Sequence, residues 1–374
     1  MSATWLLARR NLVRSRVRLI VSIGGVALAL TLVLALDAIF EGVSRQLTSY
    51  IDRSGASVWV AQSGVRNLHM VASWLPGPVT DEVRGVDGVA QAEPILYATD
   101  SIAAGEEESW AYVIGLTPSA SMGVPWDVVE GSGRPGPGEA VIDARFARRA
   151  GVGLGDAVML LGRDFRIAGL TEGTASLVNS VAFVSFDDFA ARRGGDPAVS
   201  FVLVRAAETA QPGDVVAAIE QRIDGVSVQT NEAFAQAERR LVLDMSGDVI
   251  SIMNVIGFVV GLAVVALTVY VATLALRREY GSLKAFGAPN AYLYRVVLTQ
   301  AGLSVAIGFA AGIAITAALS LLVPRSGVNL ELAISGESLA KVGIVAAVIA
   351  GLAALLPIRQ IAGLDPVVVA REGV

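Results

Sequence analysis

The sequence of 374 residues contains no cysteine and a single histidine. These absences exclude a disulfide scaffold and a cysteine-ligated zinc or iron–sulfur site, and they leave little room for a histidine-based triad. Lysine is also scarce, because the chain has only Lys284 and Lys341. A phosphate-binding P-loop needs Gly-Lys followed by Ser or Thr, and neither lysine follows a glycine. We therefore expect that this chain does not hydrolyse a nucleotide.

Charge is missing from four long stretches of the chain. Residues 19–36, 249–276, 296–324 and 342–358 contain no Asp, Glu, Lys or Arg. A helix needs about 20 apolar residues to cross roughly 30 Å of hydrocarbon. The sequence therefore predicts four transmembrane helices, and the first is too long for the apolar core of a signal peptide. Since no ionisable residue lies inside them, an ion-coupled transporter or a hydrophilic pore is disfavoured.

The basic residues orient these helices. Five arginines and no acid precede the first span, and residues 277–295 carry four basic side chains against Glu279 alone. The positive-inside rule places both regions, and the tail 359–374, in the cytoplasm. Residues 37–248 then lie outside, with 29 acidic and 16 basic side chains, a net charge of −13. We expect a multi-pass protein of a bacterial cytoplasmic membrane, with 325–341 as a second, short external loop.

Residues 37–248 predict a mixed α/β extracytoplasmic domain. Gly131–Gly138, rich in glycine and proline, predicts a turn or a seam between two lobes, and Leu161–Phe165 predicts a hairpin. Helices are expected at Thr80–Arg84, Ala144–Ala150, Phe186–Arg193 and Gly213–Ile223. Strands are expected at Val58–Ala61, Ile95–Ala98, Trp110–Leu116, Ala140–Ile142, Ala157–Leu161, Phe165–Leu170, Val181–Ser185 and Phe201–Arg205.

Apolar residues recur every three or four positions on both sides of this domain, which predicts two helices that extend the first and second spans. The two helices can pack together as a stalk, or they can be unrelated amphipathic surface helices. The apolar positions are Phe40, Val43, Leu47 and Ile51 after the first span, and Phe234, Ala237, Leu241 and Met245 before the second.

Few residues outside the membrane suggest chemistry. His69 could be a ligand or a general base, but we expect an ordinary surface or packing histidine. Glu106–Glu108 has no second acidic cluster at the spacing of a calcium loop, so we expect a solvated loop. Asp187 and Asp188 fit the start of a helix. We expect no catalytic residue, no metal and no cofactor in this chain.

The segment Arg277–Ala288 reads Arg-Arg-Glu-Tyr-Gly-Ser-Leu-Lys-Ala-Phe-Gly-Ala. If it is helical, Leu283 and Phe286 share one face. A short helix of this kind can dock in a groove of a partner and pass its movement to the adjoining spans. A solvated turn would explain the arginines by the positive-inside rule, but it would not explain these two apolar side chains.

Two Gly-x-x-x-Gly pairs lie in the second and third predicted spans. They are Gly257 with Gly261, and Gly308 with Gly312. Glycines at this spacing let two helices approach closely. The sequence leaves open whether they pack helices within one chain or form the seam of a dimer.

The segment Arg277–Ala288 resembles the cytoplasmic signature of MacB/FtsX-type ABC transporter permeases, which have the type VII ABC transporter fold. That signature runs roughly R-E-I-G-x-L-R-A-x-G-A. Tyr280 replaces the usual Ile, and Lys284 replaces Arg. The matching residues are Arg278, Glu279, Gly281, Leu283, Ala285, Gly287 and Ala288. Three more stretches are similar to the family in the same order: Ala8–Arg14 as an amphipathic N-terminal helix within residues 1–18, Gly138–Gly169 in the external domain, and Pro357–Arg359 with Leu364–Pro366 and Arg371 in the C-terminal tail.

The resemblance implies a half-transporter without an enzymatic site of its own. Two copies of this chain, or one with a related permease, would act with two copies of a separate ABC ATPase that binds ATP and Mg²⁺. The family also suggests an extracytoplasmic adaptor or substrate protein, contact with membrane lipid, and no nucleic acid. The contact with the ATPase would lie in Arg278, Glu279, Tyr280, Gly281, Leu283, Lys284, Ala285, Phe286 and Gly287, with Leu283 and Phe286 buried in it.

In this family, ATP-driven movement reaches the external domain through that segment and the stalk, and substrates are handled outside the membrane. The leading interpretation is therefore a permease subunit that exports or extracts a lipoprotein, peptide or other amphiphile. The alternative is an FtsX-like regulator that activates an external partner enzyme and transports nothing. A membrane-anchored enzyme is a third, weaker possibility.

Overall fold

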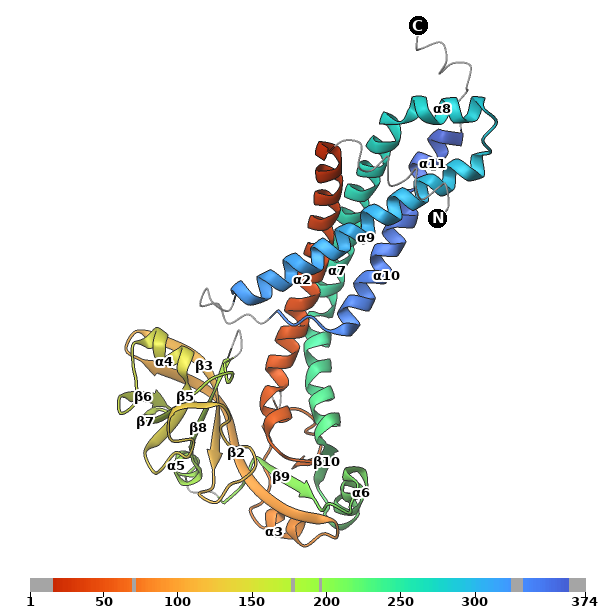
Figure 1. Ribbon diagram of the computed structural model, residues 1–374. Coiled ribbons are helices and arrows are strands. Elements are labelled where there is room, and N and C mark those ends of the chain that lie inside the picture. Colours follow the sequence, from red (N-terminus) through yellow and green to blue (C-terminus); the bar gives the residue numbers. More distant parts are fainter. Residues whose placement is uncertain (1–15, 69–71, 176–178, 195–196, 324–331, 363–374) are drawn as a thin grey trace. The chain divides into compact units, whose positions relative to one another are not determined.

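The computed structural model describes residues 16–68, 72–175, 179–194, 197–323 and 332–362 (Figure 1). The chain divides into two compact units. One consists of Met1–Gly42 with Ser246–Val374, and the other of Val43–Met245. The borders fall inside helices α2 (Arg16–Arg53) and α7 (Asn231–Ala275), so that each of these helices contributes residues to both units.

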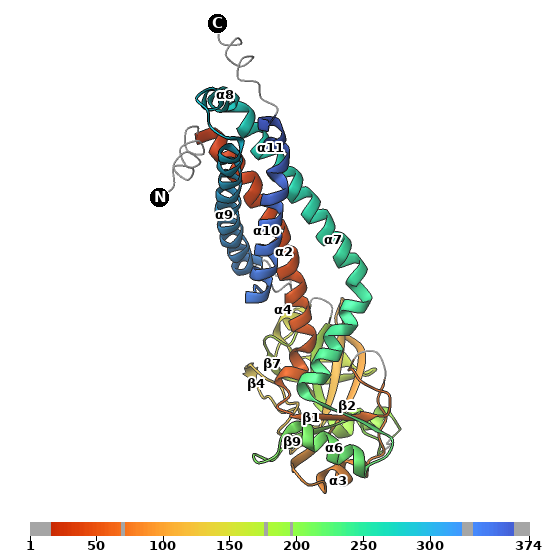
Figure 2. The same cartoon turned by 90° about the vertical axis from the view of Figure 1, so that its right-hand side faces the viewer.

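The first unit is helical. Besides its parts of α2 and α7 it contains α8 (Arg277–Ala285), α9 (Asn290–Leu322), α10 (Gly336–Ala353) and α11 (Leu355–Ala362) (Figure 2). Four stretches in the described residues are long and apolar enough to cross a membrane, as predicted, and they contain many exposed apolar side chains such as Leu28 and Leu267. These stretches are Ile23–Arg53, Val255–Ala275, Asn290–Leu322 and Gly336–Ala362.

The ends of these helices differ from the predicted spans for local reasons. Helix α9 begins six residues before the uncharged block, directly after Pro289, so it includes residues 290–295 of the segment 277–295 that was predicted to be cytoplasmic. Helix α10 begins within the predicted external loop, because Ser335 caps it and accepts a hydrogen bond from the Ser338 amide at 3.0 Å. Helix α10 ends at Ala353. If the helix continued, the ring of Pro357, four residues later, would collide with the carbonyl group of Ala353.

The second unit is built on one sheet of ten strands, in the order β10-β1-β9-β2-β3-β8-β5-β7-β4, with β6 between β2 and β7. Because β6 pairs with both β2 and β7, the six strands β2, β3, β8, β5, β7 and β6 close into a ring. The strands are β1 Val58–Gln62, β2 Val89–Ala104, β3 Glu107–Leu116, β4 Val128–Gly131, β5 Glu139–Asp143, β6 Ala157–Leu160, β7 Arg163–Thr171, β8 Asn179–Ser185, β9 Phe201–Ala206 and β10 Val226–Thr230.

The alternation of side chains along the strands gives the sheet two different faces. Trp59 and Leu203 point to one face, where they meet the end of α2 and the start of α7. Their neighbours Val58 and Val204 point to the other face, which is covered by α3 (Val79–Arg84) and α6 (Pro212–Arg222). A third cluster lines the ring together with α4 (Ala144–Ala150) and α5 (Phe186–Arg192).

All eight predicted strands and all four predicted helices of this unit are present. The hairpin at Leu161–Phe165 is also present, and its turn uses positive φ angles of 54° at Leu161 and 74° at Gly162. Strands β4 and β10 were not predicted. Strand β4 is exposed along its whole length, and it ends at Gly131, so the segment Gly131–Gly138 connects two strands.

Candidate functional site

Helix α8 follows α7 with a single residue between them. Leu276 lies in that position with φ −105° and ψ 10°, outside the helical region, which turns the chain between the two helices. The Leu276 side chain is buried in the core of the helical unit, and its carbonyl accepts a hydrogen bond from the Tyr280 amide at 3.0 Å. The joint between α7 and α8 is therefore fixed to the core.

One side of α8 is held against the rest of the helical unit. Tyr280 is buried in its core, and Leu283 packs against the same core as a half-buried side chain. Lys284 donates from Nζ to the carbonyl oxygens of Ile361 at 2.9 Å and Ala362 at 3.1 Å. Because these are the last carbonyls of α11, the ammonium group caps that helix and complements its dipole.

Helix α8 ends in a Schellman motif. The Gly287 amide donates to the Lys284 carbonyl at 2.9 Å, the Ala288 amide donates to the Leu283 carbonyl at 3.0 Å, and Gly287 has a φ of 90°. A side chain at Gly287 would be strained by that φ, which explains why the segment has a glycine there. The motif leaves Phe286, at the cap, with 91% of its surface exposed.

Leu283 and Phe286 therefore have different environments, although both were expected to face a partner. Leu283 already contacts the core of its own chain, whereas Phe286 is the apolar side chain of this segment that is open to a partner. Arg278 and Ser282 are exposed on the same helix, and Glu279 is half-buried. Together they give α8 a polar outer surface with one large aromatic group at its end.

The four glycines of the Gly-x-x-x-Gly pairs all face helices of the same chain. A Cβ at Gly257 would lie 3.2 Å from Cγ2 of Val33, and one at Gly261 would lie 3.2 Å from Cδ1 of Ile349. A Cβ at Gly308 would collide with the side chain of Val26, and one at Gly312 would lie 3.3 Å from the Thr31 amide nitrogen. Packing within one chain accounts for all four positions.

Gly308 and Gly312 belong to a longer ridge that the sequence analysis did not identify. Five buried residues of α9 recur every fourth position and are small or polar: Gln300, Ser304, Gly308, Gly312 and Thr316. The two glycines of this ridge lie against α2. The i, i+4 spacing was visible in the sequence, but it did not stand out, because apolar residues occupy most of the positions between these five.

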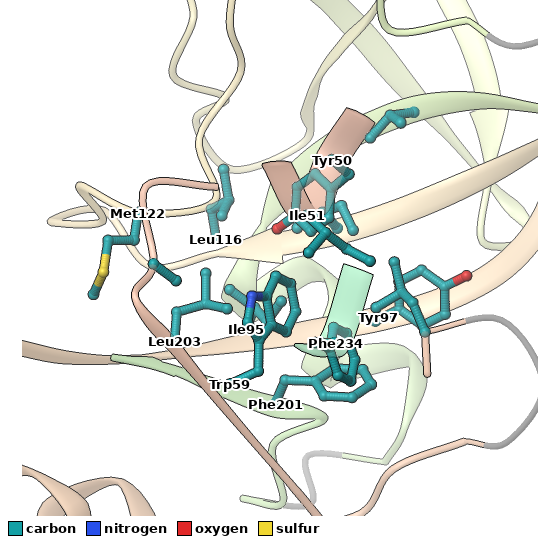
Figure 3. Packing of buried hydrophobic residues seen from close by; sticks show 14 of the residues in the cluster. Tyr50, Ile51, Trp59, Ile95, Tyr97, Leu116, Met122, Phe201, Leu203 and Phe234 are labelled. Atoms are coloured by element: carbon teal, nitrogen blue, oxygen red, sulfur yellow. The ribbon is translucent and has the colours of Figure 1, made fainter. Parts of the chain in front are cut away.

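The ends of α2 and α7 in the sheet unit are rooted in an aromatic cluster (Figure 3). Tyr50 and Ile51 come from α2 and Phe234 from α7, and all three are buried against the sheet. The rings of Phe234 and Trp59 are stacked, with centroids 4.8 Å apart and an interplanar angle of 10°. Phe201 packs edge-on against both rings, with centroids 5.8 Å and 6.0 Å away.

Polar contacts fix the same helix ends. Trp59 Nε1 donates to Asn231 Oδ1 at 2.7 Å, at the first residue of α7. The buried carboxylate of Glu238, also in α7, accepts from the Leu68 amide at 2.7 Å. Asp52 of α2 and Arg239 of α7 form an ion pair at 3.5 Å, which links the two helices directly. The helices are thus tied to the sheet and to each other within this unit.

Not all of the predicted stalk positions can be compared with the structure. Phe40, Val43 and Leu47 are half-buried along α2, and Phe234 is in the aromatic cluster. Leu241 and Met245 lie in α7, but their side chains are outside the part that the structure describes. The same holds for His69, for the segment Ala8–Arg14, and for the tail beyond Ala362.

Glu107 and Asp188 of the sheet unit take part in ordinary contacts. Glu107 pairs with Arg149 at 2.7 Å. Burial by itself would raise the pKa of Asp188, but hydrogen bonds from Ser185 and the Gly138 amide, together with Arg163, outweigh it and hold that pKa below its ordinary value. Within the described ranges, no three His, Cys, Asp or Glu side chains come together as metal ligands.

Two family models match the sequence. The model of the MacB-like periplasmic core domain matches residues 19–222, more than half of the chain, and the model of the FtsX-like permease C-terminal region matches residues 251–366. Similar full-length relatives are an uncharacterized ABC transporter permease of Mycobacterium bovis and one of Mycobacterium tuberculosis. Each is 22% identical over 351 residues, which covers 93% of this chain and 94% of the relative.

Two solved structures are similar to part of the chain. The extracellular domain of the noncanonic ABC-type transporter YknZ from Gram-positive bacteria matches with a TM-score of 0.38 and 16% identity, over 46% of this chain and 99% of that domain. The periplasmic region of MacB from Actinobacillus actinomycetemcomitans matches with a TM-score of 0.36 and 12% identity, over 49% of this chain and 94% of that region.

Proposed function

The chain belongs to the MacB-like periplasmic core domain family and is an ABC transporter permease of the MacB/FtsX type, and on this premise we propose that α8 is its contact with a separate ATPase subunit. A permease of this family implies an ATPase partner. In our proposal that partner binds ATP and Mg²⁺ and supplies the hydrolysis. Two copies of this chain, or one with a related permease, would join two copies of the ATPase.

The exposure of Phe286 carries this proposal. A phenylalanine that is 91% exposed at the capped end of a polar helix has an unfavourable contact with water that a partner's pocket would remove. Helix α8 itself cannot move far from α11 and the core, because Tyr280, Leu283 and Lys284 hold it. A force applied at Phe286 would therefore act on the whole helix and not only on a loose turn.

The way in which α7 is fixed at its two ends supports a mechanical role. Its last residues adjoin α8 through the buried Leu276, and its first residues are tied to the sheet by Phe234, Asn231 and Glu238. We propose that movement of the ATPase reaches the sheet unit along this helix. The proposal places α8 and both termini in the cytoplasm and the sheet unit outside a bacterial cytoplasmic membrane, consistent with the basic residues that flank the spans.

The class of substrate is part of the same proposal. No predicted span has an ionisable residue in its interior, which disfavours a polar path through the membrane. We propose that the substrate is an amphiphile, such as a lipoprotein or peptide, that is handled at the outer face. The alternative is an FtsX-like regulator that transports nothing. If the protein is captured by its outer face, such a regulator should copurify with an external enzyme and with no amphiphile.

The proposed contact can be tested with the full chain in lipid nanodiscs and the ABC ATPase that copurifies with it. Burial of one phenylalanine contributes about 1.5–3 kcal/mol, so Phe286→Ala should raise the ATPase concentration needed for half-maximal stimulation about 10- to 150-fold. Leu355→Ala is the matched control, because Leu355 is another exposed apolar residue of the same unit, with 53% of its surface exposed. Leu283→Asp would be a poor test, since it places a charge against the chain's own core.

Equal stimulation by the Phe286→Ala variant and the unchanged protein would refute the assignment of α8. An equal loss in the Leu355→Ala variant would also count against it, because the effect would then not be specific to the capped end of α8.

A further inference from the structure

A pocket of about 260 Å³ lies where α7 ends, α8 begins and α11 ends. Arg277, at the start of α8, and Arg359, in α11, both line it. So do Leu274 of α7, Tyr280 of α8, and Gln360 and Ile361 of α11. The contact with an ATPase proposed above does not use these two arginines, and Phe286 is not among the residues that line the pocket.

The charge of the pocket is positive. No acidic side chain of the described part of the chain lines it, and both arginines are exposed. Among the residues that the structure describes, neither guanidinium group has an ion-pair partner. A guanidinium group presents five N–H donors in a planar fork that matches the oxygens of a phosphate group. Two such groups on one pocket, with the Gln360 amide beside them, fit an anion with several oxygens.

The walls of the same pocket are partly apolar. Leu274 is 41% exposed, and it belongs to the stretch Val255–Ala275, which is apolar enough to cross a membrane. Ile361 lies at the end of a second such stretch, Gly336–Ala362. The pocket is therefore located where two membrane spans end and basic residues begin, which is the level of the lipid headgroups.

We propose that this pocket binds the headgroup phosphate of an anionic phospholipid. Arg277 and Arg359 would hold the phosphate oxygens, and an acyl chain would run along Leu274 toward the bilayer. Free phosphate is also an anion, but it has no apolar part that could contact an apolar wall at the end of a span. An acidic side chain of a partner protein would also satisfy the arginines, and the experiment below distinguishes both cases from a lipid.

The position of the site gives it a consequence for α8. Arg277 is the first residue of that helix, and Arg359 lies in α11, whose end Lys284 caps. A bound headgroup would join the start of α8 to α11, and Lys284 already joins the other end of α8 to α11. The lipid would thus hold the whole length of α8 at the membrane surface.

The experiment uses the purified full chain without any ATPase, so that its outcome is independent of the proposed function. Native mass spectrometry would measure the binding of phosphatidylglycerol and, as a neutral reference, phosphatidylcholine. We expect the double substitution Arg277→Gln and Arg359→Gln to weaken phosphatidylglycerol binding about thirtyfold, which corresponds to about 1 kcal/mol for each arginine. Binding of phosphatidylcholine should not change.

The matched control is Arg295→Gln, another exposed arginine of the same unit that does not line the pocket. Both pocket arginines are exposed, so their substitution leaves the core intact. The single variant Arg359→Gln gives a second and milder test, in which phosphatidylglycerol binding should weaken about fivefold. Each variant should keep the thermal stability of the unchanged protein in phosphatidylcholine.

Three results would overturn the proposal. The first is unchanged phosphatidylglycerol binding in the double variant. The second is an equal loss in the Arg295→Gln variant, which would indicate a general effect of surface charge. The third is displacement of the lipid by inorganic phosphate at the same concentration as by added phosphatidylglycerol, because the apolar wall would then contribute nothing. A separate binding measurement with the ATPase added covers the remaining case: if the double variant keeps its lipid but no longer binds the ATPase, the pocket receives an acidic protein surface instead.

Discussion

The attachment of α7 to the sheet unit depends on Phe234, and its truncation is the sharpest test of that attachment. Phe234 is 1% exposed and stacks on Trp59 with ring centroids 4.8 Å apart. The substitution Phe234→Ala removes this ring from the centre of the aromatic cluster. The first turns of α7 would keep the hydrogen bonds of Asn231 and Glu238 but would lose their main apolar contact.

The magnitude of the loss follows from the burial of this side chain. Truncation of a fully buried phenylalanine to alanine costs about 3–5 kcal/mol, and a stacked aromatic pair contributes about 0.5–1.5 kcal/mol that is part of this loss. A domain of this size is stable by about 5–15 kcal/mol, so we expect the unit to remain folded but to open far more often. The two strands next to Phe234, β1 and β9, should show the effect most clearly.

Hydrogen–deuterium exchange of the full chain in nanodiscs can measure how often β1 and β9 open. Peptides that cover Val58–Gln62 and Phe201–Ala206 should exchange with an opening free energy lower by about 3–5 kcal/mol in the Phe234→Ala variant. Trp110→Ala is the matched control, because it also truncates an aromatic side chain of this unit but one that is 58% exposed. It should change the exchange of β1 and β9 by less than about 1 kcal/mol.

If the two variants exchange alike, the aromatic cluster does not anchor α7 and cannot pass a movement of this helix to the sheet. If only α7 loses protection from exchange, and β1 and β9 keep theirs, the helix frays without disturbing the sheet. This result would also contradict our account.

Two further predictions concern packing in the membrane and acid stability. Gly308→Ala should lower the thermal midpoint of the full chain in nanodiscs, because its Cβ collides with Val26 and overpacking costs about 1–3 kcal/mol, whereas Gly302→Ala, with open space at its Cβ, should not lower it. Asp188 has a lowered pKa in the folded state, so its contribution to stability is present above about pH 4 and is lost as the pH falls through the folded-state pKa. The difference in thermal midpoint between the unchanged protein and the Asp188→Asn variant should therefore narrow as the pH falls from 4 to 3, and a difference that stays constant from pH 7 to pH 3 would contradict this.

Much of the fold was predictable because its signals are local. The uncharged stretches indicated four spans, and the β-type runs between turn residues indicated the eight strands that carry the core. Strand β4 was missed because its four residues are all exposed and the strand has no apolar alternation. Strand β2 was predicted only at Ile95–Ala98 but runs over Val89–Ala104, because its ends pair with β9 and β6, which are distant in the sequence.

The candidate site was predictable as a segment but not as a surface. The sequence indicated Leu283 and Phe286 as one apolar face, since a spacing of three residues fits a helix. It could not indicate that Leu283 contacts the core and that the Schellman motif leaves Phe286 exposed, because both depend on how α8 lies against the rest of the unit. The pocket between Arg277 and Arg359 was equally hidden, since these residues are 82 positions apart in the sequence.

The central claim is that the sheet unit lies on the outer side of the membrane and that α8 lies on the cytoplasmic side, in contact with the ATPase subunit. Because the chain has no cysteine, the single variants Trp110→Cys and Phe286→Cys can be labelled without background in intact cells. Our account predicts that a membrane-impermeant maleimide labels the Trp110→Cys variant from outside, and that the Phe286→Cys variant reacts only after the membrane is opened and is then protected by the ATPase. Labelling of both variants from the same side of the intact membrane would contradict it.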